Sequence, residues 1–110
     1  MLSRTGFTVK ERVLYSQLRQ LLNKPGLVRG SLVEMRRSCG KAACACARDP
    51  ARRHRSLYLG LSRRGQRRML YIPPAWEGRV RQWVGRYAEV REVLERISRE
   101  YVQRLERRGE

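Results

Sequence analysis

The residues with the clearest chemistry are three closely spaced cysteines and the only histidine of the chain. They are Cys39, Cys44, Cys46 and His54. Zinc prefers four sulfur or nitrogen ligands arranged as a tetrahedron, and these side chains complete a Cys3His set. The sequence therefore predicts a structural Zn²⁺ bound by these four residues. Asp49, or a residue from a second chain, is the alternative to His54 as the fourth ligand.

The surroundings of the cysteines favour a metal over other uses of a thiol. Small buried hydrophobic residues, redox-active thiols and disulfides are the alternatives, and an odd number of cysteines leaves one thiol unpaired. A cluster flanked by Lys41, Arg48 and Asp49 is difficult to bury in an apolar core. Gly40 directly follows Cys39, and a residue without a Cβ lets the backbone fold closely so that its N–H groups point at sulfur. The spacing lacks paired Cys-x-x-Cys units, so it indicates a metal without indicating a finger class.

The second prominent feature is a strong excess of positive charge. The formal net charge is +16, and residues 1–74 hold 17 basic and 3 acidic side chains, against 9 and 7 in residues 75–110. Solubility needs only a fraction of this charge. Because so many like charges repel one another, a compact protein tolerates them best with a polyanion as partner. We expect that partner to be nucleic acid, with DNA preferred, and with RNA or a ribonucleoprotein as the alternative.

The chain begins its ordered structure with a predicted helix over residues 9–23. Thr8 followed by Glu11 forms a capping-box pattern, and the apolar residues after it recur at helical spacing. Pro25 and Gly26 end the helix.

Short alternating segments after this helix predict strands. Residues 31–36 form one candidate strand, and residues 57–61 alternate apolar and other side chains in the pattern of a second. A turn over 62–66, which contains Gly65, leads to a return strand over 67–72. The expected product is a β-hairpin whose tip and flank are rich in arginine.

Arginine is suited to nucleic-acid recognition because its planar fork of donors matches phosphate and the O6 and N7 edge of guanine. Tyr58 is a candidate for stacking on a base, with packing on the sheet as the alternative. The predicted nucleic-acid-binding residues are Arg36, Arg37, Lys41, Arg48, Arg52, Arg53, Arg55, Tyr58, Arg63, Arg64, Arg67 and Arg68.

A long helix is predicted over residues 75–107, because two prolines precede a series of apolar residues that step by three and four. Gly85 is a point where this helix is expected to bend or break. A helix of this length runs about 50 Å, more than a small domain can cover. We expect it to pair with the first helix in antiparallel fashion and also to form a homodimer or dock on a larger protein. Its coiled-coil-like seam consists of Trp83, Tyr87, Val90, Leu94, Ile97 and Tyr101.

These elements predict an α+β fold with an N-terminal helix, a small zinc-stapled antiparallel sheet and a long C-terminal helix. We expect one compact domain with segments at 1–27, 28–74 and 75–110. Four protein ligands leave no open metal position for catalysis, so we expect a non-enzymatic protein. No apolar run is long enough for a membrane span, and the first eight residues lack the apolar segment of a secretory signal. We therefore expect a cytoplasmic protein associated with a nucleoid or ribonucleoprotein.

The chain also resembles a family of small bacterial and archaeal proteins of unknown activity over about residues 28–106. Members carry a C-G-K-x-x-C-x-C knuckle, a histidine, a hairpin and a C-terminal helix, and they are often encoded near mobile elements. The resemblance implies that the three cysteines and His54 occupy the family's cysteine and histidine positions. It is carried by Gly30-Ser31-Leu32-Val33, Arg36-Arg37-Ser38-Cys39-Gly40-Lys41, Cys44, Cys46-Ala47-Arg48, His54, Tyr58, Tyr71-Ile72-Pro73, Trp83 and Tyr87.

Overall fold

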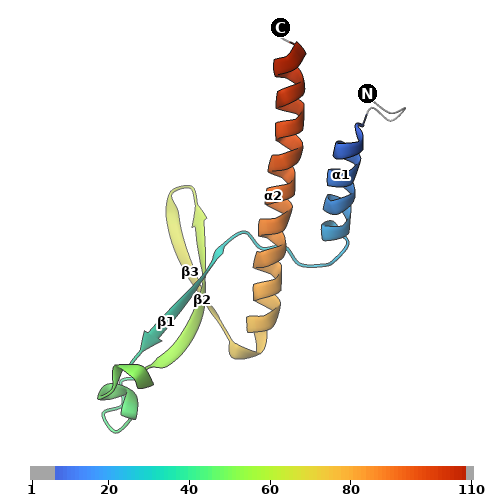
Figure 1. The fold of residues 1–110 in the computed structure, drawn as a ribbon. Coiled ribbons are helices and arrows are strands. Elements are labelled where there is room, and N and C mark those ends of the chain that lie inside the picture. The colour runs from blue at the N-terminus through green and yellow to red at the C-terminus, as the bar shows by residue number, and fades with distance from the viewer. Residues whose placement is uncertain (1–6, 109–110) are drawn as a thin grey trace. The chain divides into compact units, whose positions relative to one another are not determined.

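The computed structural model describes residues 7–108, and it confirms the expected α+β arrangement (Figure 1). Most of the segment considered for a secretory signal lies outside the described residues. The elements in chain order are α1 (Val9–Leu22), β1 (Ser31–Arg37), the 3-10 turns η1 (Ala45–Ala47) and η2 (Pro50–Arg52), β2 (His54–Arg63), β3 (Gln66–Ile72), η3 (Pro74–Trp76) and α2 (Glu77–Arg108).

These elements form two compact units. The helical unit contains the described residues up to Leu27 and from Gly85 onward, and the sheet unit is Val28–Val84. Helix α2 contributes to both units and continues through Gly85, where a bend or break was expected. A glycine inside a helix costs only about 1 kcal/mol relative to alanine, and the hydrogen-bonded turns on either side of Gly85 are enough to keep the helix continuous. Within residues 7–108, no helix combines the length and apolar character that a membrane crossing requires.

The helical unit is an antiparallel pair formed by α1 and the later part of α2. The capping box of α1 is confirmed: the Glu11 N–H donates to the Thr8 hydroxyl (3.1 Å), and the Thr8 N–H donates to the Glu11 carboxylate (3.3 Å). The same carboxylate is buried, forms an ion pair with Arg104 and accepts a hydrogen bond from the Tyr101 hydroxyl (3.5 Å). Farther along α1, Leu14 packs against Val93 and Ile97 of α2. One carboxylate therefore caps α1 and also joins the two helices.

The buried stripe of α2 differs from the predicted seam. Val90, Val93 and Ile97 are buried, whereas Leu94 is 49% exposed and Tyr101 is 38% exposed. The apolar stripe of α2 is wider than the seam of a coiled coil. Helix α1 covers one flank of this stripe, which contains Val93 and Ile97. The flank that contains Leu94 stays exposed in the helical unit.

The sheet unit contains three antiparallel strands in the order β1-β2-β3. Arg64 and Gly65 connect β2 to β3 as a two-residue turn in which both residues have positive φ (52° and 77°). Such turns match the right-handed twist of a hairpin, and glycine adopts a positive φ readily. The turn is shorter than the predicted 62–66 segment, and β2 begins at His54, earlier than predicted, because its pairing with β1 continues to that residue.

One face of the sheet packs against the beginning of α2. Leu57 and Leu59 from β2, Ile72 from β3 and Val80 from α2 form the buried cluster. Partly buried apolar side chains surround it, namely Val28, Leu32, Leu61, Leu70, Trp83 and Val84. The predicted partner residue Trp83 is thus part of the core of the sheet unit. Because side chains alternate along a strand, the intervening residues face the other side of the sheet.

Candidate metal centre

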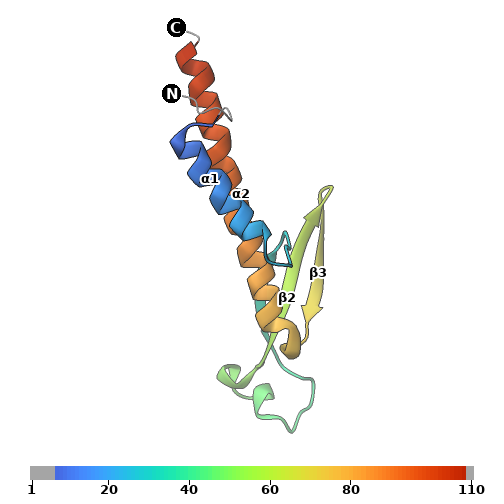
Figure 2. The ribbon, with the colours of Figure 1, turned by 90° about the vertical axis from the view of Figure 1, so that its right-hand side faces the viewer.

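The predicted metal ligands lie in and beside the connection between β1 and β2, which we call the cysteine loop (residues 38–53). Arg37, the last residue of β1, pairs with His54, the first residue of β2, so the ends of the loop are held together. The loop contains η1 and η2 and lies at one end of the strands, with the β2–β3 turn at the other (Figure 2). Sheet pairing therefore positions the loop.

The four predicted ligands come together in one cluster. One donor atom from each of Cys39, Cys44, Cys46 and His54 lies within 4.8 Å of all the others. The sulfurs of Cys39 and Cys46 are 3.5 Å apart, and His54 Nε2 is 3.4 Å from the sulfur of Cys44. A tetrahedral zinc with bonds of about 2.0–2.3 Å separates its donors by about 3.6–3.8 Å. The cluster is therefore compatible with a structural zinc site.

Backbone hydrogen bonding prepares one of the thiols for metal binding. The Cys39 N–H donates to the sulfur of Cys46 (3.3 Å), and this bond lowers the pKa of Cys46 to about 6. Cys46 is only 2% exposed and is the one buried residue of the cysteine loop. For Cys44, the backbone N–H of Cys46 lowers the pKa, but hydrogen bonds with the Cys46 and Cys39 side chains outweigh it, and the pKa is raised. Metal ligation needs thiolates, so Cys46 is readier to bind a metal than Cys44.

Gly40 contributes its backbone conformation rather than a hydrogen bond to sulfur. Its φ is +83°, a conformation that favours glycine, and nothing lies within 4 Å of where a Cβ would be. Its N–H donates to the Ser38 hydroxyl (3.4 Å), and the N–H that reaches sulfur belongs to Cys39. A backbone N–H of this segment therefore points at sulfur as expected, and it belongs to Cys39 rather than to Gly40.

Asp49, the alternative fourth ligand, lies outside the cluster. Its carboxylate accepts a hydrogen bond from the Ala51 N–H (3.0 Å), which caps η2, and lies 3.8 Å from Arg52. Among the described residues, His54 supplies the fourth donor instead.

Some of the basic residues predicted to bind nucleic acid are already paired with carboxylates. Arg55 forms ion pairs with Glu34 (3.0 Å) and Glu77 (2.8 Å), and Arg36 lies 3.4 Å from Glu34. The hydrogen bond from Arg55 also lowers the pKa of Glu77. Arg55 therefore stabilises the sheet unit. Sequence reasoning missed Glu77 because it is far from Arg55 in the chain and belongs to the less basic C-terminal segment.

The other predicted cations are exposed, and within residues 7–108 no ion pair is seen for them. They are Arg37, Lys41, Arg48, Arg53, Arg63, Arg64, Arg67 and Arg68. Half of this set lies at the end of the sheet with the cysteine loop and half near the β2–β3 turn. The register places Arg67 and Arg68 on opposite faces of the hairpin, opposite Ser62 and Leu61 respectively. The hairpin therefore presents arginine on both of its faces.

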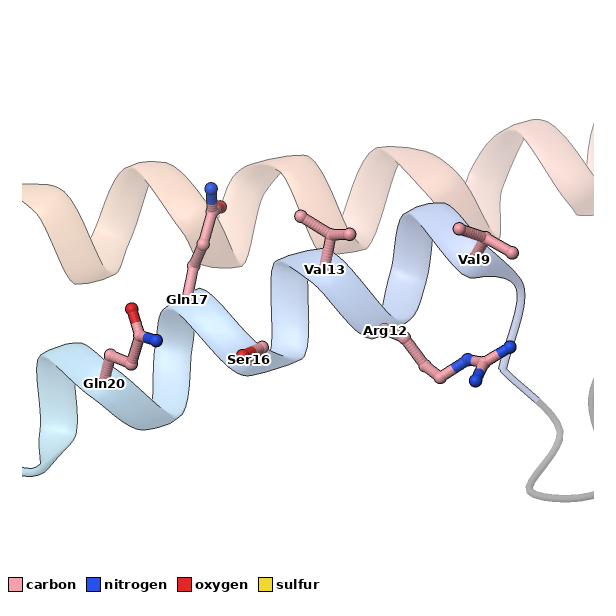
Figure 3. Close-up of a pocket in the computed structure, with 6 residues that line it drawn as sticks. All are labelled: Val9, Arg12, Val13, Ser16, Gln17 and Gln20. Atoms are coloured by element: carbon pink, nitrogen blue, oxygen red, sulfur yellow. The ribbon is translucent and has the colours of Figure 1, made fainter.

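A shallow hollow on α1 offers no comparable chemistry (Figure 3). Its lining contains one charged side chain and no cysteine, histidine or carboxylate; the residues are Val9, Arg12, Val13, Ser16, Gln17 and Gln20. The cysteine loop and the neighbouring sheet therefore carry the candidate functional site.

Comparisons with known proteins bear on the family of this chain. Neither the curated proteins nor the solved structures gave a significant match. A family model described as "Domain of unknown function (DUF6788)" matches residues 10–82, a range that includes all of α1 but its first residue, the whole sheet and the four clustered cysteine and histidine residues. Since this match covers most of the sequence, the chain belongs to the DUF6788 family.

Proposed function

We propose that this protein is a non-catalytic nucleic-acid-binding protein whose basic surface is stabilised by a structural zinc. The observation that carries the proposal is the group of eight exposed cations for which the described residues provide no ion pair. Unpaired cations on a fixed scaffold bind polyanions because each phosphate contact releases condensed counterions. The resemblance to proteins encoded near mobile elements favours DNA over RNA as the partner and a role linked to such an element.

The geometry of the cluster supports a structural role for the metal. Four protein donors satisfy tetrahedral zinc, and a catalytic zinc needs one position open for water or substrate. The one carboxylate of the cysteine loop, Asp49, is occupied by Ala51 and Arg52. We therefore propose that the zinc orders the cysteine loop and so holds its exposed cations in fixed positions.

The binding test is a fluorescence-anisotropy titration of labelled duplex DNA, single-stranded DNA and RNA at several salt concentrations. With four to eight phosphate contacts, log affinity is expected to fall against log salt with a slope of about −4 to −7 for duplex DNA. No binding to any of the three probes at low salt would contradict the proposal.

A charge-reversal pair locates the surface. The test variant changes Arg63, Arg64, Arg67 and Arg68 to Glu; the matched control changes Arg91, Arg99, Arg107 and Arg108 on α2. Both alter the net charge equally. We expect the hairpin variant to lose binding at least tenfold more than the control, and equal losses would show that only total charge matters.

A second candidate function is self-association through α2. Leu94, Tyr101 and Leu105 lie on one helical face, and Leu105 is 68% exposed. We propose that a second copy of the chain covers this face. Light scattering should then give a dimer for the native protein and for Gln103→Glu, and a monomer for Leu94→Glu. A native monomer at high concentration would refute this candidate.

A further inference from the structure

The sheet face opposite the core carries a row of aromatic and aliphatic side chains. Leu57 and Leu59 point into the core, so Tyr58 between them faces the other way. The register places Val33 of β1 and Tyr71 of β3 opposite Tyr58 on its two sides. The row therefore crosses all three strands. We call this surface, with Met35 and Met69, the open face; it consists of Val33, Met35, Tyr58, Met69 and Tyr71.

The aromatic side chains of the open face are accessible. Tyr71 is 55% exposed, and Tyr58 is half-buried. Their rings meet edge to face, with centroids 5.7 Å apart and planes inclined at 67°. Neither tyrosine belongs to the buried cluster of the sheet unit. The face therefore holds a preformed aromatic pair that the core does not use.

Cations flank this aromatic pair at both ends. Arg67 lies beside the backbone of Gly60, where its Nη2 is 3.2 Å from the position that a Cβ would occupy. The missing side chain of Gly60 therefore lets the guanidinium lie against the sheet. At the other end, the Arg37 guanidinium contacts the sulfur of Met35 (3.2 Å). Both cations lie over the open face.

The acidic residue of the strands lies on the opposite face. Glu34 pairs with Leu57 in the register, which places it on the core side, where it binds Arg55 and Arg36. Asp49 lies in the cysteine loop and caps η2. In the three strands as the structure describes them, the open face and the adjoining Arg37 and Arg67 therefore combine aromatic rings and cations without a carboxylate.

We infer that the open face binds single-stranded nucleic acid, with bases stacked on Tyr58 and Tyr71 and phosphates contacting Arg37 and Arg67. This inference rests on the proposed function and specifies the form of its ligand. A duplex keeps its base faces stacked inside, whereas single strands offer them to exposed aromatic side chains on sheets. Apolar side chains and cations together match a ligand with both base faces and phosphates.

The dimensions of the open face set the length of strand that it binds. Arg37 is level with His54 and Arg67 with Ser62 along β2. At about 3.3 Å per residue, the positions of Arg37 and Arg67 along β2 are about 26 Å apart. The surface therefore accommodates a few nucleotides, near the lower end of the roughly 4–16 nucleotides that single-strand-binding domains cover.

The test compares a labelled eight-nucleotide strand, as DNA and as RNA, with a labelled DNA duplex. Stacking contributes about 1–3 kcal/mol per base, so Tyr71→Ala should weaken single-strand binding by about 5- to 150-fold. Tyr71→Phe keeps the ring and should bind within about twofold of the native protein. Trp76→Ala is the matched control, because Trp76 is another exposed aromatic residue of the same unit but packs against Trp83 away from the open face.

The outcomes separate this inference from the proposed function. If the native protein binds no nucleic acid, the proposed function fails first. If it binds but Tyr71→Ala binds single strands as tightly as native protein, only the stacking inference is wrong. An equal loss for single strands and duplex would likewise reject stacking. If Tyr71→Ala instead turns a native dimer into a monomer without changing affinity, a second copy of the chain covers the open face.

Discussion

Removing zinc should unfold the cysteine loop while the helical unit stays folded. Ordering residues 38–53 costs on the order of 16 kcal/mol, even at the low value of about 1 kcal/mol per residue. Apart from Cys46, no residue of this loop is buried, so apolar burial offsets little of that cost. Six backbone hydrogen bonds within the loop contribute about 1 kcal/mol each, or about 6 kcal/mol. Without a metal, the ordered loop is therefore unfavourable by about 10 kcal/mol.

A structural zinc would supply the missing free energy. Apparent contributions in zinc-finger peptides are about 10–16 kcal/mol, which matches the deficit. The packing of Leu14, Val93 and Ile97 in the helical unit involves none of the four ligands. Chelation should therefore affect the cysteine loop and leave the helix pair intact.

Hydrogen exchange measured by mass spectrometry, with and without a strong chelator, tests this expectation. Zinc-loaded protein should contain about one zinc per chain. Its loop amides, including those of Ala47 and Arg52, should be protected from exchange, and chelation should abolish this protection. Cys46→Ser should behave like chelated protein, and the adjacent exposed change Ala47→Ser should not. Equal protection of the loop with and without chelator would refute the reasoning, as would metal-free protein with an ordered loop.

Three further predictions follow from individual contacts. His54→Ala should lower zinc affinity by at least tenfold in a competition assay, whereas Asp49→Asn should leave it within about twofold; the reverse order would make Asp49 the ligand. Glu11→Ala should lower the free energy of unfolding by about 3–5 kcal/mol in urea denaturation, because it leaves Arg104 without its buried partner, and Glu11→Gln should lose less. Gly40→Ala should destabilise the zinc-loaded protein by about 1 kcal/mol or more, since φ there is +83°, whereas Gly78→Ala in α2 should be neutral or stabilising; equal effects would exclude a backbone requirement at Gly40.

Much of the fold follows from local sequence signals. The capping box at Thr8 and Glu11 predicts the start of α1, and alternation around Tyr58 predicts β2. Local patterns do not decide which flank of a wide apolar stripe another helix will cover. The sequence predicts Leu94 in the partner-facing seam of α2 but does not predict that α1 packs on Val93 and leaves Leu94 exposed.

The candidate site was predictable in its composition but not in its charge pairing. Three cysteines and one histidine, four residues of two rare types, lie close together along the chain and were enough to indicate the clustered donor residues. The ion pair of Arg55 with Glu77 joins residues that only tertiary structure brings together. Tyr71 likewise becomes a partner of Tyr58 only through the β2–β3 register. Each of these contacts depends on pairing distant segments, for which composition carries no information.

Strand register connects the metal cluster to the open face. A slip of one residue between β1 and β2 would turn Glu34 toward the open face and Val33 toward the core, because side chains alternate. The two-residue turn at Gly65 fixes the register of β2 and β3 locally, but the cysteine loop is too long to do so for β1 and β2. Cys39 follows β1 closely and His54 begins β2, so a zinc held by both would fix that register. A zinc bound at this cluster would therefore keep the open face free of carboxylates.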